Sequence, residues 1–308
     1  MSSLYIILGI VMVLWGADRL TDGATALAQR MNIPQIVIGL TIVAMGTSMP
    51  EFFVSLVSAL RGTTDMAVGN IVGSNIFNTL LIVGVAALVA PMAISRNTVK
   101  KDMPFAVVAS VLLAGMSMDG EISVADAFLL FVMFLLFMAY TLRLAKKEVP
   151  EENTMVKNMA VWKGCFFVVL GLACLVIGSN LFVEGATKVA RLLGVSDAVI
   201  GLTIVAGGTS LPELATSAVA AYKGRSAIAI GNVVGSNVFN ILMILGITGM
   251  ICPMDLQGIT MVDLSVMLGS IILLWLFSFT KYTVARWEGA VLALAFCGYM
   301  GWLIAHTL

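Results

Sequence analysis

Residues 39–51 read GLTIVAMGTSMPE, and residues 201–213 read GLTIVAGGTSLPE. A second matching pair follows at residues 69–78, GNIVGSNIFN, and at residues 231–240, GNVVGSNVFN. Both pairs are separated by 162 residues, because 201 − 39 and 231 − 69 give the same difference. A constant offset shared by two motifs is the signature of an internal duplication, so we interpret the chain as two copies of one unit.

The duplication extends well beyond the motifs. The two copies align without a gap from Gly16 and Gly178 to Gly84 and Gly246. Between them, the stretch KKEVPEENTMVKN is the best candidate for a linker, because it is polar in an otherwise apolar chain. The predicted organisation is a first repeat at residues 1–145, a linker at residues 146–158 and a second repeat at residues 159–308.

The composition indicates that both copies lie in a membrane. Of the 308 residues, 60% are apolar and only 11% are Asp, Glu, Lys or Arg, whereas a soluble domain carries roughly 25% charged residues. The mean hydropathy is +1.05. Because a spanning helix needs about 20 residues, we predict an all-α membrane protein with ten transmembrane helices. The predicted spans lie near residues 4–28, 34–60, 66–90, 104–118, 123–144, 160–190, 195–222, 227–251, 261–279 and 285–306.

Five helices per copy is an odd number, so the second copy must enter the membrane upside down relative to the first. Basic residues test this topology, because they are enriched in cytoplasmic loops. With the N-terminus outside, the outer loops hold only Arg61, Lys188 and Arg191. The cytoplasmic loops, which include the linker, hold 13 basic residues: Arg30, Arg96, Lys100, Lys101, Arg143, Lys146, Lys147, Lys157, Lys163, Lys223, Arg225, Lys281 and Arg286. We therefore predict two inverted five-helix repeats, a recurrent transporter plan, with both chain ends outside.

Each GTSxPE motif places a carboxylate inside an apolar helix. A charged side chain near the bilayer centre costs about 2.5–3.5 kcal/mol, so each glutamate needs partners. The proline before each glutamate lacks an N–H group, which frees carbonyl groups of the preceding turn to face a ligand. The Thr and Ser of the motif lie four and three residues before the glutamate, on one helix face. The residues in this arrangement are Thr47, Ser48 and Glu51, repeated as Thr209, Ser210 and Glu213.

The GNxVGSNxFN segments add further oxygen atoms. In each segment a serine and an asparagine lie four residues apart and therefore share a helix face. These pairs are Ser74 with Asn78 and Ser236 with Asn240. The glycines of the segments let neighbouring helices approach closely, as small residues do in membranes.

Together the motifs favour a hard divalent cation. Inverted symmetry would set Glu51 opposite Glu213, and two carboxylates balance two positive charges. Calcium takes about six to eight oxygen ligands in flexible geometry, which this set of side chains and carbonyls can supply. A soft or transition metal would need Cys or His. The four cysteines show no C-x-x-C spacing, and the one histidine, His306, lies at the end of the chain.

Each feature also has a purely structural interpretation. A lone intramembrane glutamate can be protonated and hydrogen-bonded to a neighbouring helix, but two symmetric copies with Pro, Thr and Ser favour a ligand site. For the Gly–Ser segments, helix packing and ligand binding both stay open. Asp18, Asp22 and Glu184 could line an ion vestibule, although pairing with Arg19 or with a helix end is the interpretation that we favour.

At these residues the chain resembles the cation/calcium exchanger superfamily, specifically the prokaryotic type of its sodium/calcium exchanger branch. The resemblance covers nearly the whole chain. Animal exchangers carry a large insertion between the halves, and this chain does not. It implies ten helices in two inverted five-helix halves, with the second, third, seventh and eighth helices forming the site. It also implies that the first and sixth helices slide past this core to switch access.

The resemblance assigns roles position by position. Calcium would be held by Glu51, Glu213 and the carbonyl groups of Thr47 and Thr209. Asn78 and Asn240 would flank the centre. The sodium sites would be completed by Ser48, Ser74, Ser210 and Ser236, with the carbonyl groups of Ala44 and Ala206.

The resemblance implies a sodium/calcium antiporter that works by alternating access. GTSxPE replaces the GNxxE-type motif of proton/calcium exchangers, which favours sodium, and Asn240 stands where potassium-dependent relatives carry Asp. The alternatives are a proton/calcium exchanger and a cation channel that uses the two glutamates as a selectivity ring. An enzyme is disfavoured, because GTSxPE has no partner His or Lys.

We expect a multi-pass protein of a bacterial or archaeal plasma membrane. The expected partners are the transported ions, Ca²⁺ and Na⁺, and the lipid bilayer, with no cofactor and no nucleic acid. The sequence leaves the oligomeric state open, a monomer included.

Overall fold

The computed structural model describes residues 2–145, 159–194, 200, 204–256 and 258–307, so the predicted linker at residues 146–158 lies outside the described residues. The first copy contains α1 (Ser2–Met31), α2 (Gln35–Ile38), η1 (Gly39–Val43), α3 (Ala44–Thr47), α4 (Met49–Leu60), α5 (Thr64–Ile76), η2 (Phe77–Ile82), α6 (Val83–Val89), β1 (Met92–Ala93), η3 (Thr98–Asp102), α7 (Met103–Met116), η4 (Ser117–Asp119), β2 (Glu121–Ile122) and α8 (Val124–Ala145). The second copy contains α9 (Val161–Leu192), α11 (Ala206–Thr209), α12 (Leu211–Tyr222), α13 (Ser226–Val238), η6 (Phe239–Ile244), α14 (Leu245–Ile251), β3 (Met254–Asp255), α15 (Met261–Ser278), β4 (Thr283–Val284) and α16 (Arg286–Thr307). The short helices η1, η2, η3 and η6 are π-helical, and η4 is a 3₁₀-helix.

The described helices are long and apolar enough to form a membrane domain. Eight of them could each cross a bilayer, and the bent pair Gln35–Thr47 and Met49–Leu60 raises the number of spans to nine. The chain is therefore an all-helical membrane protein, in which the backbone polar groups are satisfied within each helix. The predicted span at residues 195–222 lies partly outside the described residues, and α11 and α12 form its described end.

The fourth predicted span, at residues 104–118, is too short. The helical segment starts at Thr98 and runs to Asp119. The predicted span began only after Lys100 and Lys101, which were assigned to a cytoplasmic loop. In the structure both lysines are exposed on the first turns of the segment, where long basic side chains can keep their charge in water.

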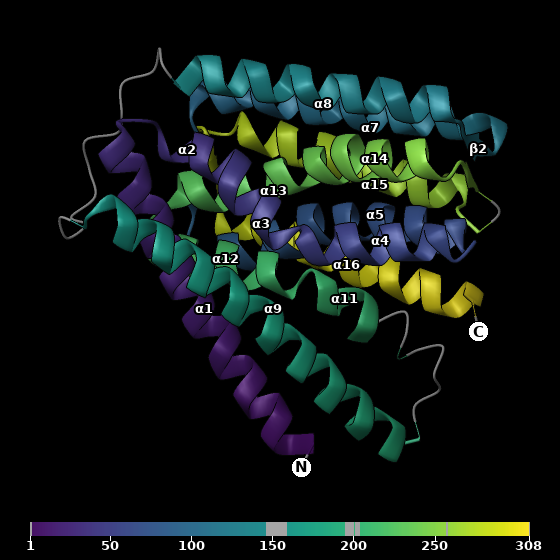
Figure 1. The fold of residues 1–308 in the computed structure, drawn as a ribbon, viewed down its shortest axis with the longest axis horizontal. Helices are drawn as coiled ribbons and strands as arrows, with labels where there is room; N and C mark the ends of the chain where they lie inside the picture. Colours follow the sequence, from purple (N-terminus) through teal and green to yellow (C-terminus); the bar gives the residue numbers. More distant parts are fainter. Residues whose placement is uncertain (1, 146–158, 195–199, 201–203, 257, 308) are drawn as a thin grey trace.

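The two helices α1 and α9 pack against each other through glycines. A Cβ atom on Gly9, Gly16 or Gly23 would lie only 2.7–2.8 Å from the carbonyl oxygens of Gly178, Gly171 and Gly164, respectively. These contacts run in opposite directions along the two helices, which are therefore antiparallel. Close backbone approach of this kind requires small residues. Figure 1 shows that the pair crosses the molecule obliquely and leaves the remaining bundle.

The remaining helices enclose the segments that carry the second motif. In Figure 1, α7 and α8 lie along one side of this bundle and α16 along the other, with α13 and α14 between them. The segment Ser226–Ile251 is buried along its whole apolar stretch, and Thr64–Val89 is buried along 72% of its stretch. Most residues of the second motif therefore lie in the core and not on the lipid-facing surface.

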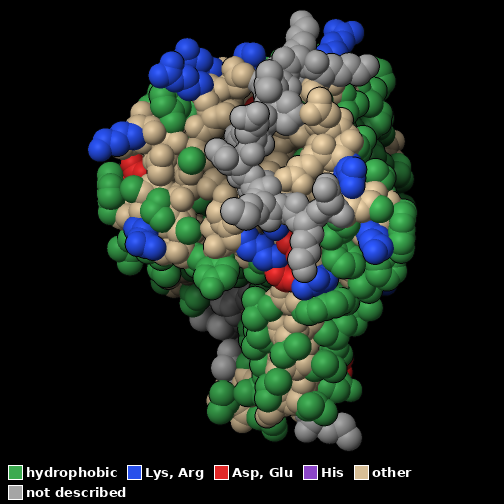
Figure 2. Space-filling model, turned by 90° about the vertical axis from the view of Figure 1, so that its left-hand side faces the viewer, with side chains coloured by type: hydrophobic (Ala, Val, Ile, Leu, Met, Phe, Trp, Pro, Cys, Tyr) green, Lys and Arg blue, Asp and Glu red, His purple; other side chains and the backbone are tan. Residues whose placement is uncertain are grey.

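Two short antiparallel ladders connect the copies at opposite ends of the bundle. β1 pairs with β4 at one end, and β2 pairs with β3 at the other. Figure 2 shows the first of these ends, where Lys and Arg side chains are spread over the surface and a few Asp and Glu side chains lie among them. We refer to the end that carries β1 and β4 as the basic face.

Candidate cation site

A helix break lies immediately before each glutamate of the GTSxPE motifs. α3 ends at Thr47, Ser48 adopts φ −83° and ψ 7°, and α4 begins at Met49. The two helices are bent by 46°. Pro50 lies in the first turn of α4, where its missing N–H group needs no partner. The second copy repeats the break at Ser210, which has φ −89° and ψ 6°.

The breaks place both glutamates at helix starts deep in the protein. Glu51 lies in the first turn of α4 and Glu213 in the first turn of α12. Each residue is only 1% exposed. The N-terminal end of a helix stabilises a negative charge through its unpaired N–H groups and its dipole. The helix N-termini thus offset part of the free energy needed to bury two carboxylates.

The serines of the motifs bind across the two copies. The hydroxyl of Ser48 donates a hydrogen bond of 3.0 Å to Oε1 of Glu213, and the hydroxyl of Ser210 donates one of 2.9 Å to Oε1 of Glu51. The sequence suggested instead that each serine shares a helix face with the glutamate of its own motif. Ser48 and Ser210 are the break residues themselves and lie just outside α4 and α12, so the regular helical spacing does not apply to them. These reciprocal hydrogen bonds bring both glutamates to one interface between the halves.

Several buried oxygen atoms at this interface have no hydrogen-bond donor among the described residues. They are Oε2 of Glu51, Oε2 of Glu213, Oδ1 of Asn78, Oδ1 of Asn240 and Oγ of Ser236. All five residues are at most 1% exposed. Buried polar atoms are normally paired with protein groups, waters or ions, so these acceptors are available to a ligand. A cation bound between the halves would satisfy them.

Two π-helical turns carry the asparagines of this cluster. Asn78 lies in η2 and Asn240 in η6, which directly follow α5 and α13, respectively. A π-turn inserts an extra residue into a helix and is frequent at functional sites. The neighbouring serines differ: Ser74 Oγ lies 3.3 Å from Ser210 Oγ, whereas Ser236 Oγ has no partner among the residues described.

Two asparagines of the GN motifs, for which the sequence predicted no role, hold the broken helices in place. Asn70 Nδ2 donates to the carbonyl of Glu51 at 3.2 Å and to Ser55 Oγ at 3.0 Å. Asn232 Nδ2 does the same for Glu213 and Ser217, at 3.3 and 3.0 Å. Their repetition in both GN motifs was the signal that could have identified them.

The threonines and alanines of the motifs were predicted to act through their carbonyl groups. The hydroxyl of Thr47 is directed to Asn232 Oδ1, at 3.0 Å. The carbonyl of Ala44 accepts the N–H of Ser48 at 3.0 Å. Thr209 and Ala206 lie at matching positions in α11. The role of these four carbonyl groups as ion ligands stays a prediction.

The acidic residues of α1 form ion pairs on the basic face. Asp18 pairs with Arg19 at 2.6 Å and with Lys223. Asp22 pairs with Lys223 at 2.9 Å and with Arg225 at 2.7 Å, so its partners come from the α12–α13 connection. Pairing with Arg19 was predicted for this group, but Lys223 and Arg225 were not. In α9, Glu184 pairs with Lys188 of its own helix.

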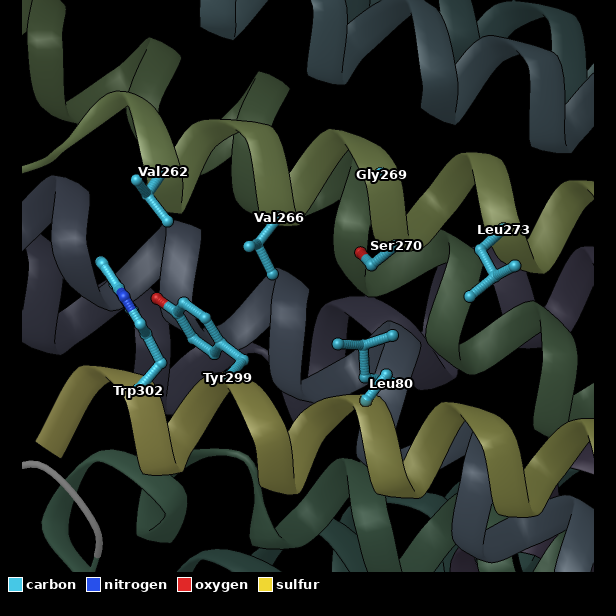
Figure 3. Close-up of a pocket in the computed structure, with 9 residues that line it drawn as sticks. Leu80, Val262, Val266, Gly269, Ser270, Leu273, Tyr299 and Trp302 are labelled. Atoms are coloured by element: carbon cyan, nitrogen blue, oxygen red, sulfur yellow. The ribbon is translucent and has the colours of Figure 1, made fainter. Parts of the chain in front are cut away.

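An apolar cavity among the described residues lies apart from the carboxylates, and neither Glu51 nor Glu213 lines it. It has a volume of about 430 Å³ and is lined mainly by apolar side chains of α15 and α16, together with Leu80 of η2. Figure 3 shows Val262, Val266, Tyr299 and Trp302 pointing into the space between these helices. Its walls offer almost no oxygen ligands, so this cavity cannot replace the glutamate cluster as a cation site.

Comparison with known proteins identifies the family of the chain. The model of the family described as sodium/calcium exchanger protein matches residues 1–143 and 163–305. Putative antiporter CaxA of Alkalimonas amylolytica is 38% identical over 97% of both chains. Sodium/calcium exchanger MaX1 of Methanosarcina acetivorans is 32% identical over 96% of this chain and 97% of its own. A solved structure of the sodium-calcium exchanger NCX_Mj superposes with a TM-score of 0.86 at 30% identity, and covers 97% of this chain and 98% of that one. The chain therefore belongs to the sodium/calcium exchanger family.

Proposed function

We propose that this protein exchanges sodium for calcium by alternating access, at a single all-oxygen site around Glu51 and Glu213. The observation that carries the proposal is the set of unpaired acceptors at the interface of the two halves. Both Oε2 atoms and both asparagine Oδ1 atoms are buried without a donor among the described residues. Leaving such groups unpaired is costly, more so for charged ones, and a bound cation would offset that cost.

The charge and the ligand types support calcium. Two carboxylates match one divalent ion, and the amide, hydroxyl and carbonyl oxygens supply the remaining ligands of a coordination shell of about six to eight. The serines keep one carboxylate oxygen of each glutamate engaged and leave the other for the ion. Among the described residues, no cluster of three or more His, Cys, Asp or Glu side chains offers a competing metal site.

A shared site supports exchange. Sodium ions and calcium would use the same glutamates, so they cannot occupy the centre together. Only one kind of ion would then cross in each stroke. The serines Ser48, Ser74, Ser210 and Ser236, with the carbonyls of Ala44 and Ala206, would complete the sodium positions. Asn78 and Asn240 are both neutral, so the site holds two formal negative charges.

The architecture supports access from both sides. We infer ten membrane helices in two inverted five-helix repeats, with the glutamates near the midplane and both chain ends outside a bacterial or archaeal plasma membrane. The antiparallel glycine contacts of α1 and α9 are the packing expected of inverted counterparts. The basic face would be cytoplasmic. The α1–α9 pair, which leaves the bundle, would slide against the remaining helices to switch access.

The decisive experiment uses proteoliposomes of the full chain. Vesicles loaded with sodium, potassium or choline receive external calcium-45, each with and without a proton gradient. Uptake that requires internal sodium supports the proposal. Uptake that ignores sodium but follows the proton gradient would identify a proton/calcium exchanger instead. Calcium flux that needs no counter-ion and rises linearly with driving force would identify a channel.

A further inference from the structure

Four asparagines meet where the two GNxVGSNxFN segments face each other. Asn75 and Asn78 belong to α5 and η2, and Asn237 and Asn240 belong to α13 and η6. All four residues are at most 4% exposed. Asn78 and Asn240 belong to the proposed ion site, whereas Asn75 and Asn237 have no role in it so far.

Each site asparagine is held by an asparagine of the other copy. Asn240 Nδ2 donates to Asn75 Oδ1 at 3.0 Å, and Asn78 Nδ2 donates to Asn237 Oδ1 at 3.2 Å. The nitrogen of each site amide is thereby engaged. The oxygen atoms of Asn78 and Asn240 are left buried and without a donor among the described residues.

The two supporting asparagines are themselves fixed in orientation. Asn75 Nδ2 donates to the carbonyl of Asn237 at 3.3 Å. Asn237 Nδ2 donates to Thr79 Oγ1 at 2.7 Å. Because the nitrogen end of each amide is occupied, its oxygen end must accept from the site asparagine.

We propose that Asn75 and Asn237 are positioning residues that keep the side-chain oxygens of Asn240 and Asn78 turned toward the transported cation. An amide has a partly negative oxygen and a partly positive NH₂ group, so a rotated amide would repel a cation that the correct orientation attracts. The inference rests on the proposed function, because it requires Asn78 and Asn240 to line the ion site.

A carboxylate offers a way to test orientation separately from packing. Aspartate has an oxygen at both ends of its side chain, so it needs no partner to turn the correct atom toward the ion. In an Asn78→Asp background, Asn237 should therefore lose its importance. In an Asn240→Asp background it should keep it, because Asn240 is oriented by Asn75 and not by Asn237.

The experiment measures the half-saturating calcium concentration for binding to the purified full-length protein. Asn237→Leu should raise it about tenfold, the effect of losing one buried hydrogen bond to a ligand group. In the Asn78→Asp background the same substitution should change it by no more than about twofold. In the Asn240→Asp background the tenfold effect should return. The mirror set, Asn75→Leu in the same two backgrounds, should give the opposite pattern.

If Asn237→Leu and Asn75→Leu weaken calcium binding by the same factor in all backgrounds, the proposal is overturned, and Asn237 and Asn75 are packing residues. If Asn237→Leu does not fold, Asn237→Ala carries the same test, since its side chain cannot reach the amide of Asn78. Failure of the proposed function gives a different result, because binding would then be insensitive to Asn78→Asp and to Glu213→Ala in the first place.

Discussion

The buried centre and the ion pairs of the α1–α9 pair differ in how far their contacts are repeated in the two copies. In the centre, several contacts occur twice. Asn70 donates to the carbonyl of Glu51 at 3.2 Å, and Asn232 donates to that of Glu213 at 3.3 Å. The serine bonds between the halves also occur in both directions, at 3.0 and 2.9 Å.

The ion pairs do not occur twice. Asp22 of α1 binds Lys223 and Arg225 of the α12–α13 connection. Its counterpart at the repeat offset, Glu184 of α9, pairs with Lys188 one turn along its own helix, and both side chains are about half exposed. The difference is the one expected if the proposed ion site constrains both halves equally, whereas contacts between the α1–α9 pair and the rest of the bundle were free to diverge.

The largest expected effect comes from removing one carboxylate of the centre. We expect Glu213→Ala to lower calcium transport at least about 100-fold, because a divalent ion would lose half of its compensating charge in a buried site. Glu51→Ala should lose as much. Calcium-45 uptake into sodium-loaded vesicles measures both, with the exposed Glu184→Ala as a matched control that stays within about twofold. Substantial exchange by the Glu213→Ala protein would remove Glu213 from the site.

A smaller and equally symmetric effect is expected from the serines. Ser48→Ala and Ser210→Ala each remove a hydrogen bond to a carboxylate, which should raise the half-saturating calcium concentration about tenfold. Titration of purified protein with calcium-45 checks this. Ser265, an exposed serine that bonds within its own helix α15, supplies the control Ser265→Ala. A loss in only one of the two site variants would show that the halves do not contribute equally.

Of the two ion pairs at matching positions, only that of Asp22 should contribute to the stability of the protein, and that of Glu184 should not. In Asp22, Lys223 and Arg225 the side chains are 24%, 21% and 10% exposed, so the cluster is only partly screened. We expect Asp22→Asn to destabilise the protein by about 1 kcal/mol, measured by thermal unfolding in detergent. Glu184→Gln should leave the unfolding temperature unchanged. Equal shifts for the two variants would contradict the asymmetry.

The smallest expected effect lies where the centre itself departs from symmetry. Thr79 accepts a hydrogen bond from Asn237, and Ile241 stands at the matching position of the second copy. Thr79→Val preserves the shape and removes the acceptor, so we expect about a threefold rise in the half-saturating calcium concentration. Ile241→Val, measured by the same titration, should have no effect. Identical behaviour of the two variants would show that the hydroxyl contributes nothing.

Much of this organisation could be predicted from the sequence, because a feature found in one copy can be compared with the matching residues of the other copy. The spans at residues 66–90 and 227–251 match the described helical segments Thr64–Val89 and Ser226–Ile251 to within two residues. The glutamates were identifiable because a carboxylate in an apolar helix is costly and two matched copies are hard to explain without a ligand.

Contacts between distant segments could not be predicted in the same way. Helical spacing assigned Ser48 to the face of Glu51, but the break at Ser48 turns its hydroxyl to Glu213. The partners of Asp22 lie 201 and 203 residues away, beyond the reach of any local pattern. Asn75 and Asn237 were visible in the motifs, yet their orientation depends on how the two halves meet.

Equilibrium binding of calcium-45 to the purified full-length protein, with and without sodium, tests most directly whether the two halves build one site. We expect one calcium ion per chain, displaced by sodium, with binding lost in both Glu51→Gln and Glu213→Gln. Two calcium ions per chain, or unchanged affinity in either variant, would contradict a single site shared by the two glutamates.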